Sequence, residues 1–222
     1  MQLIRILAAV LTTAATVAAQ AATTFHEGFD DVAALGSEGW SNLNLSRVPN
    51  GPAWFQGDGL TFTGEDGPAT SYAAANYLTT GVGAIDDWLV TPAIKLTGGD
   101  VLHFSIQGLP GPWTDNLRVL VGDGSAAART DFKTLNFDIS GIPTQWTDIA
   151  LDLPQASADG SVRIAFEYYG NFRSSNYMGL DDVSVTGNAA AVPEPASAVL
   201  LGLGFGAIAL KSRRRKAREA IA

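Results

Sequence analysis

Two stretches of the chain combine aromatic rings with amide and charged side chains, a combination that can bind sugars. Residues 113–116 follow a Pro-Gly-Pro turn, and residues 168–173 end a strand-like segment shortly before Asn176. An exposed ring can stack on a sugar face while neighbouring amide and charged groups bind the hydroxyls. Alternatively, both stretches pack as loops over the end of the fold. The predicted sugar-binding residues are Trp113, Asn116, Tyr169, Asn171 and Tyr177.

Sequence motifs for catalysis are missing. The chain contains neither a G-x-S-x-G nor an H-E-x-x-H run, and it has no cysteine for thiolate chemistry or disulfides. Its two histidines, His26 and His103, lie far apart in the sequence. Two carboxylates at the right separation can hydrolyse a glycosidic bond, but a sequence does not contain that separation. We therefore predict a non-catalytic protein, with a secreted glycan-degrading enzyme as the alternative.

The middle of the chain is strongly acidic. Between residues 22 and 191 there are 7 Lys and Arg against 20 Asp and Glu, a net charge of −13. Such a surface repels nucleic acid and anionic lipid, so we expect no nucleic-acid partner. It suits calcium, cationic partners or neutral polymers, although solubility alone also explains surface carboxylates. No EF-hand run of the form D-x-[DN]-x-[DN]-G is present.

The elements that must hold these residues are predicted to be β-strands. Residues 101–106, 117–121, 162–169 and 180–185 are strand-length segments rich in apolar residues, and three of them end at glycine-containing turns. No part of the middle segment has a sustained helical stripe. The spacing predicts an all-β fold, a two-layer antiparallel sandwich, with loops at residues 58–71 and 110–113.

The N-terminus reads as a secretory signal peptide over residues 1–21. Arg5 supplies a positive charge, residues 6–19 are apolar, and Ala19-Gln20-Ala21 forms an A-x-A cleavage site. An uncleaved N-terminal anchor is the alternative. Residues 22–188 then form one mature domain, which is long enough to bury a core without disulfides.

The last segment, residues 189–222, has three parts. Residues 192–195 contain the motif Pro193, Glu194, Pro195, residues 196–210 are uncharged and mostly apolar, and residues 211–218 are basic. The apolar run is shorter than the roughly 20 residues of a comfortable membrane span, and the basic cluster would stay on the cytoplasmic side. An ordinary membrane anchor or a buried apolar helix would also account for this pattern.

The order of these three parts resembles the PEP-CTERM sorting signal. That resemblance implies export through the secretion translocon, transient anchoring in the inner membrane by a transmembrane sorting helix, and processing by an exosortase-type enzyme. The expected location is the bacterial cell envelope, the cell surface or the extracellular matrix.

Several short motifs in the middle segment follow one another in a recognisable order. They are residues 25–30 (Phe-His-Glu-Gly-Phe-Asp), Gly39-Trp40, residues 86–92 (Asp-Asp-Trp-Leu-Val-Thr-Pro), residues 146–153 and residues 179–185. The series resembles choice-of-anchor J domains and the related cleaved-adhesin and MAM-type jelly rolls over residues 25–186. The resemblance implies a jelly-roll sandwich used for binding or adhesion. In that fold Trp40 and Trp88 are core residues, Pro92 ends a strand, and residues 179–185 form the last strand, which pairs near the first.

The same resemblance implies a structural calcium ion. Ca²⁺ takes six to eight oxygen ligands from carboxylates, backbone carbonyls and water. Related jelly rolls supply such ligands from positions that correspond to Asp30 and Asp181, with Glu27 and Asp182 as second choices. Alternatively, these acids cap turns or face the solvent.

Taken together, these patterns predict an exported, non-catalytic, adhesin-like sandwich that binds extracellular polysaccharide or another cell-surface component. Apart from the enzyme, the remaining alternative is a structural envelope protein that has no specific ligand.

Overall fold

The computed structural model describes residues 22–154 and 160–187. The predicted signal peptide, the sorting motif at Pro193 to Pro195, the apolar span and the basic tail lie outside these residues. Within the described ranges, no helix is both long enough and apolar enough to cross a membrane. The membrane anchor therefore stays a prediction.

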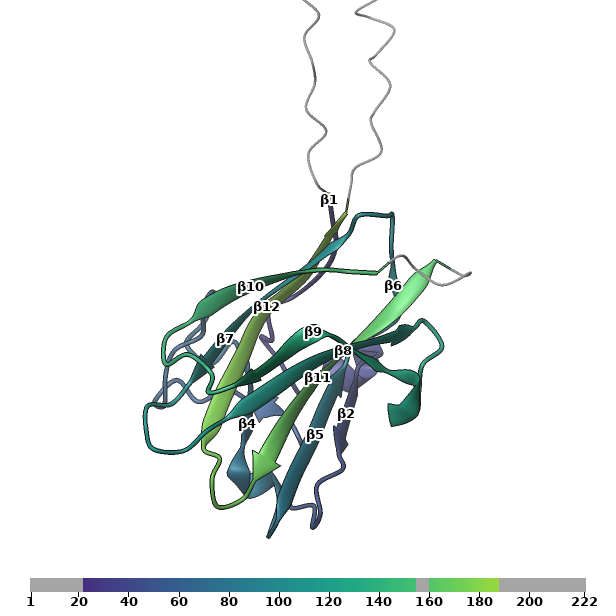
Figure 1. Ribbon diagram of the computed structural model, residues 1–222. Helices are drawn as coiled ribbons and strands as arrows, with labels where there is room; N and C mark the ends of the chain where they lie inside the picture. The colour runs from purple at the N-terminus through teal and green to yellow at the C-terminus, as the bar shows by residue number, and fades with distance from the viewer. Residues whose placement is uncertain (1–21, 155–159, 188–222) are drawn as a thin grey trace, which may run out of the picture. The chain divides into compact units, whose positions relative to one another are not determined.

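Two antiparallel sheets pack face to face, as Figure 1 shows, and this confirms the predicted all-β sandwich. Sheet A has the order β10-β7-β12-β4-β3, with β1 also paired to β12, and sheet B has the order β2-β5-β11-β8-β9, with β6 also paired to β11. Sheet A contains β1 (Ala22–Glu27), β3 (Phe55–Gln56), β4 (Ala73–Asn76), β7 (Val101–Gly108), β10 (Thr147–Asp152) and β12 (Tyr177–Gly187). Sheet B contains β2 (Ser41–Asn44), β5 (Ala84–Val90), β6 (Ile94–Lys95), β8 (Asn116–Asp123), β9 (Lys133–Ser140) and β11 (Ser161–Asn171).

The connections between strands are those of a jelly roll. Most successive strands cross from one sheet to the other, and β8 and β9 form a hairpin within sheet B. The helices of the described residues are three short 3₁₀ turns, η1 (Leu35–Glu38), η2 (Tyr77–Thr79) and η3 (Arg129–Asp131). All four predicted strand segments are strands, and β5 ends at Val90, two residues before the proline that cannot donate to a ladder.

The core lies between the sheets and is built from alternate residues of facing strands. Phe104 of β7 and Phe166 of β11 are both buried, and their ring centroids are 5.3 Å apart at an interplanar angle of 74°. Edge-to-face pairs of this kind add to the stabilisation that burial alone provides. Trp40 is buried in this core as predicted. Trp88 is also buried, but it belongs to a separate cluster with Phe132 because neighbouring residues of β5 point to opposite faces of sheet B.

Strand β12 contains a β-bulge at its two consecutive acids. Leu180 and Val183 both point into the core, and the pairing with β7 shifts between Asp181 and Ser184. Asp182 has a positive φ of 52°, a backbone conformation that Asp tolerates better than most residues. A bulge of this kind re-aims side chains. As a result, both carboxylates leave the core face of the strand and lie on the outer side of sheet A.

The long loop between β3 and β4 covers part of the outer face of sheet A. Phe62 of this loop stacks on Tyr72 at 4.9 Å, and the Trp146 indole nitrogen donates to the Thr63 carbonyl oxygen at 2.8 Å. Gly179 lies beneath these rings, because a Cβ atom there would stand 2.8 Å from both the Trp146 and Tyr72 side chains. The loop therefore packs directly on the sheet and brings Glu65 to the edge of the site described next.

Candidate functional site: a trough on sheet A

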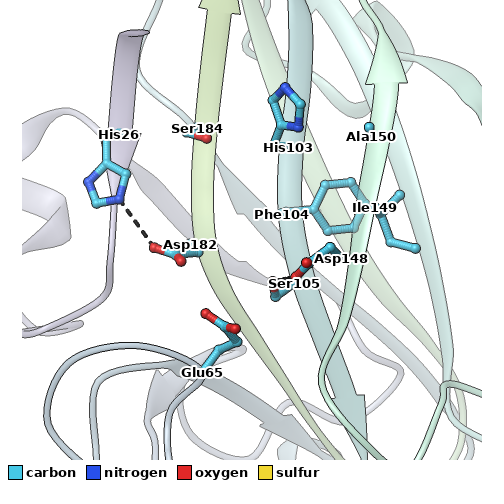
Figure 2. A pocket seen from close by; sticks show the side chains of 10 residues that line it. All are labelled: His26, Glu65, His103, Phe104, Ser105, Asp148, Ile149, Ala150, Asp182 and Ser184. Atoms are coloured by element: carbon cyan, nitrogen blue, oxygen red, sulfur yellow. Dashed lines mark hydrogen bonds and ion pairs between the residues drawn. The ribbon is translucent and has the colours of Figure 1, made fainter.

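A cavity of about 430 Å³ lies on the outer face of sheet A. We refer to it as the trough, and Figure 2 shows the side chains that line it. Its lining comes from the four neighbouring strands β1, β12, β7 and β10 and from the loop between β3 and β4. The lining residues are His26, Glu65, His103, Phe104, Ser105, Asp148, Ile149, Ala150, Asp182 and Ser184.

Strand register places four of these residues in one row across the sheet. His26 pairs with Ser184, Ser184 pairs with His103, and His103 pairs with Ala150. Large and small side chains therefore alternate, and Figure 2 shows the two imidazole rings on either side of Ser184. Directly opposed residues in a sheet have Cβ atoms only about 5 Å apart. The small side chains create the hollow because they leave space unfilled, and the imidazole rings form its sides.

A second row supplies acceptors. Asp181 of β12 pairs with Ser105 of β7, and Ser105 pairs with Asp148 of β10. The Ser105 hydroxyl donates to Asp148 Oδ1 at 2.7 Å, which orients that carboxylate. His26 Nε2 lies 3.2 Å from Asp182 Oδ1.

Glu65 completes the acidic end of the trough. Desolvation raises the pKa of its carboxyl, and the neighbouring Asp182 and Asp148 raise it further, because like charges disfavour ionisation. Its backbone N–H donates to Asp181 Oδ2 at 2.8 Å. The buried Asp181 therefore holds in place the loop that carries Glu65.

The predicted calcium residues are divided between two places. Asp30, Asp181 and Asp182 line a second, smaller cavity of about 110 Å³ next to the trough, together with Asp66. Glu27 does not line it, since its carboxylate accepts from the backbone N–H of Phe29 at 2.7 Å. The predicted proximity of the two ends of the domain follows from the pairing of β1 with β12.

Within the smaller cavity, the buried carboxylate of Asp181 is the group best suited to bind a cation. Its side chain is 1% exposed, and burial raises its pKa to about 7. Asp30 Oδ1 lies 2.6 Å from the Ser71 hydroxyl, which also lies 2.7 Å from the Gly28 carbonyl oxygen. The described residues contain no group of three or more His, Cys, Asp or Glu that could hold a metal by themselves. A calcium ion at Asp30 and Asp181 would need carbonyl and water oxygens as well, and it stays a prediction.

The predicted sugar-binding residues differ in exposure and in their partners. Trp113 is 51% exposed, whereas Tyr177 is 8% exposed and its hydroxyl lies 3.0 Å from that of Tyr72. Tyr177 therefore packs beneath the loop between β3 and β4.

The other three predicted sugar-binding residues have partners within the protein. The guanidinium of Arg118 covers the ring of Tyr169 at 4.5 Å from its centroid. Asn116 donates to the Tyr169 carbonyl oxygen at 3.0 Å, and Asn171 accepts from the backbone N–H of Arg173 at 3.1 Å.

Sequence reasoning missed the trough. In the sequence, His26 and His103 are far apart, and Asp148 is only one residue of the motif at 146–153. The available signal was the alternation in β7, where His103 and Ser105 occupy successive outward positions. That pattern identifies an outward face, but it does not identify the neighbouring strands.

Comparison with known proteins identifies the sorting segment and the fold. The family model for the PEP-CTERM protein-sorting motif matches residues 191–216, which indicates an exported protein sorted to the cell envelope. No curated protein matches the chain by sequence.

Two solved structures share the sandwich. One is the K1 cleaved adhesin domain of Lys-gingipain from Porphyromonas gingivalis W83, with 20% identity, a TM-score of 0.57 and coverage of 76% of this chain and 100% of that chain. The K3 domain of the same protein has 18% identity, a TM-score of 0.53 and the same coverage. The predicted cleaved-adhesin-like fold is confirmed, whereas the narrower choice-of-anchor J assignment stays a prediction.

Proposed function

We propose that this exported sandwich is a non-catalytic domain that binds polysaccharide through the trough on sheet A. The observation that carries the proposal is the row of His26, Ser184, His103 and Ala150, which leaves a hollow with hydrogen-bonding groups on both sides. Its volume lies within the range of pockets that take small ligands, roughly 300–1,000 Å³. An open hollow that crosses four strands suits part of a polymer chain, because the chain can leave at both ends.

The lining supplies groups that sugars use. Carboxylates accept hydrogen bonds from hydroxyls, and imidazole and serine groups both donate and accept. No Lys or Arg is among the lining residues.

A filled trough tests the proposal. In the double variant Ala150→Leu/Ser184→Leu, the added side chains should occupy the hollow and lower polysaccharide retention by at least about tenfold, since lost hydrogen bonds to buried polar groups are costly. Retention is measured by affinity gel electrophoresis of the exported protein, in gels that each contain one polysaccharide from a panel of neutral and charged polymers. The matched control is Ala84→Leu/Ser140→Leu, which makes the same two substitutions at exposed positions of sheet B.

Three results would contradict the proposal. Absence of retention on every polysaccharide would favour a structural envelope protein. Equal retention by the filled and control variants would move binding to another surface, of which the exposed Trp113 is the first candidate. Release of oligosaccharide products would favour the glycan-degrading enzyme.

We also propose that an exosortase-type enzyme removes the C-terminal segment after export. The matched motif supports this, because it contains Pro193 to Pro195 and ends within the basic tail. We expect mass spectrometry of the protein from a host with the sorting system to detect no peptide containing residues 213–218. An intact C-terminus on most exported molecules would instead indicate a retained membrane anchor.

A further inference from the structure

The two sheets differ in charge. The strands of sheet A contain five acidic residues and no Lys or Arg, whereas the strands of sheet B contain four basic residues, namely Lys95, Arg118, Lys133 and Arg163. On sheet B, Arg118 pairs with two of the acids: it lies 2.9 Å from Asp138 and 3.1 Å from Glu167. The acidic charge of sheet A has no such compensation from its own strands.

The trough lies on this cation-free sheet and concentrates its charge. Glu65, Asp148 and Asp182 all line it, and the only nitrogen-containing side chains in the lining are the two histidines. His26 Nε2 lies 3.2 Å from Asp182 Oδ1, while His103 Nε2 lies 3.1 Å from the Thr186 hydroxyl. A neutral sugar would leave this local repulsion in place, whereas a cationic ligand would relieve it.

From the trough and the segregation of charge between the sheets, we propose that the ligand is a polysaccharide carrying free ammonium groups, such as a polymer of amino sugars. This inference rests on the proposed function and specifies its ligand class. An ammonium group has three donors and no acceptor, which matches three carboxylates that only accept. Charge-assisted hydrogen bonds of this type are roughly twice as strong as neutral ones.

A lone metal ion fits the same charge less well. The described residues contain no His, Cys, Asp and Glu group arranged to hold a metal. The hollow is also much larger than an ion, and its floor of Ser105, Ala150 and Ser184 is made of small side chains across three strands. This shape leaves room for a sugar ring beside the charged group.

The test compares two oligosaccharides of the same length and linkage, one with free ammonium groups and one in which acetylation has removed their charge. The probes are a β-1,4-linked glucosamine hexamer and the fully N-acetylated hexamer of the same length, and binding is measured by isothermal titration calorimetry at slightly acidic pH. We expect the free amine form to bind at least about tenfold more tightly, and we expect added salt to reduce the difference.

Two charge variants distinguish binding of the amine hexamer at the trough from its general attraction to an acidic protein. Glu65→Gln/Asp148→Asn removes two charges from the trough, and Glu38→Gln/Asp152→Asn removes two exposed charges elsewhere. Both variants have the same net charge. We expect only the trough variant to lose the preference for the amine form.

The possible outcomes distinguish failure of the ammonium preference from failure of the proposed polysaccharide binding. Equal affinity for the two hexamers would overturn the ammonium preference while leaving polysaccharide binding intact. If both variants lose the preference for the amine form equally, the preference is nonspecific charge attraction, and the inference is overturned. If neither hexamer nor any polysaccharide of the panel binds, the proposed function fails as well.

Discussion

Replacing Asp87 with Asn is expected to flatten the pH dependence of this protein's stability. Asp87 lies on β5 and points between the sheets, with a fully buried side chain. Its Oδ1 accepts from the Ser46 hydroxyl at 2.9 Å, whereas Oδ2 has no hydrogen-bond partner. An ionised carboxylate in such a place is costly, because one oxygen loses its hydration without replacement.

The direction of the effect follows from the proton balance. Burial raises the pKa of Asp87 to about 6, above the ordinary value of 3.8, despite the hydrogen bond from Ser46. The folded protein therefore binds a proton that the unfolded chain has already lost. The associated stability is fully present below about pH 3.8 and is lost as the pH rises through about 6, a total of about 3 kcal/mol.

The measurement is the free energy of unfolding in urea, from about pH 4.5 to about pH 7.5. Over this interval wild-type protein should lose about 2 kcal/mol more than Asp87→Asn, whose uncharged amide still offers an oxygen to Ser46. Asp152→Asn, at an exposed position of β10, should follow the wild type. Parallel curves for wild type and Asp87→Asn would show that Asp87 is ionised at no cost in the folded protein.

Calcium is expected to stabilise the protein through Asp181. This carboxylate is buried, and burial raises its pKa to about 7 although its oxygens accept backbone N–H groups. A cation bound at Asp181 and Asp30 would compensate the buried charge. Binding to the folded state alone raises the free energy of unfolding by about 2.7 kcal/mol at a hundredfold excess over Kd, which corresponds to about 5–11 °C in melting temperature for a domain of this size.

Melting temperatures with millimolar calcium and with a chelator measure this effect. Asp181→Asn should remove most of the calcium increment, whatever it does to the stability without calcium. Asp148→Asn should keep the increment, because Asp148 lines the trough and not the smaller cavity. A melting temperature that calcium leaves unchanged at near-neutral pH would eliminate the metal site and leave the fold assignment intact.

The sequence alone predicted the class of fold well, because its signals are local. Alternation in residues 101–106 and 162–169 reports which side chains face the core, and the turn residues after them report where strands end. The family resemblance, rather than local alternation, predicted the burial of Trp40 and the pairing of the last strand with the first. The sorting motif is linear, so its recognition needed no structure.

The candidate binding surface was decided by the tertiary structure. His26 and His103 share one row only because β1 and β7 both pair with β12 in one register. Shifting a strand by one residue would turn every side chain to the opposite face, and the alternation within one strand says nothing about its neighbours.

Individual side chains illustrate the same limit. Tyr177 looked like a sugar-binding residue next to Asn176, yet the loop between β3 and β4 buries it against Tyr72. The bulge turns Asp181 and Asp182 to one side of β12, although strict alternation would separate them. The sequence determined that this chain is exported and folds as an acidic β-sandwich, because composition, alternation and linear motifs carry that information. Only the tertiary structure decided which acids meet, because contacts between distant strands depend on register, bulges and loop packing that no single segment contains.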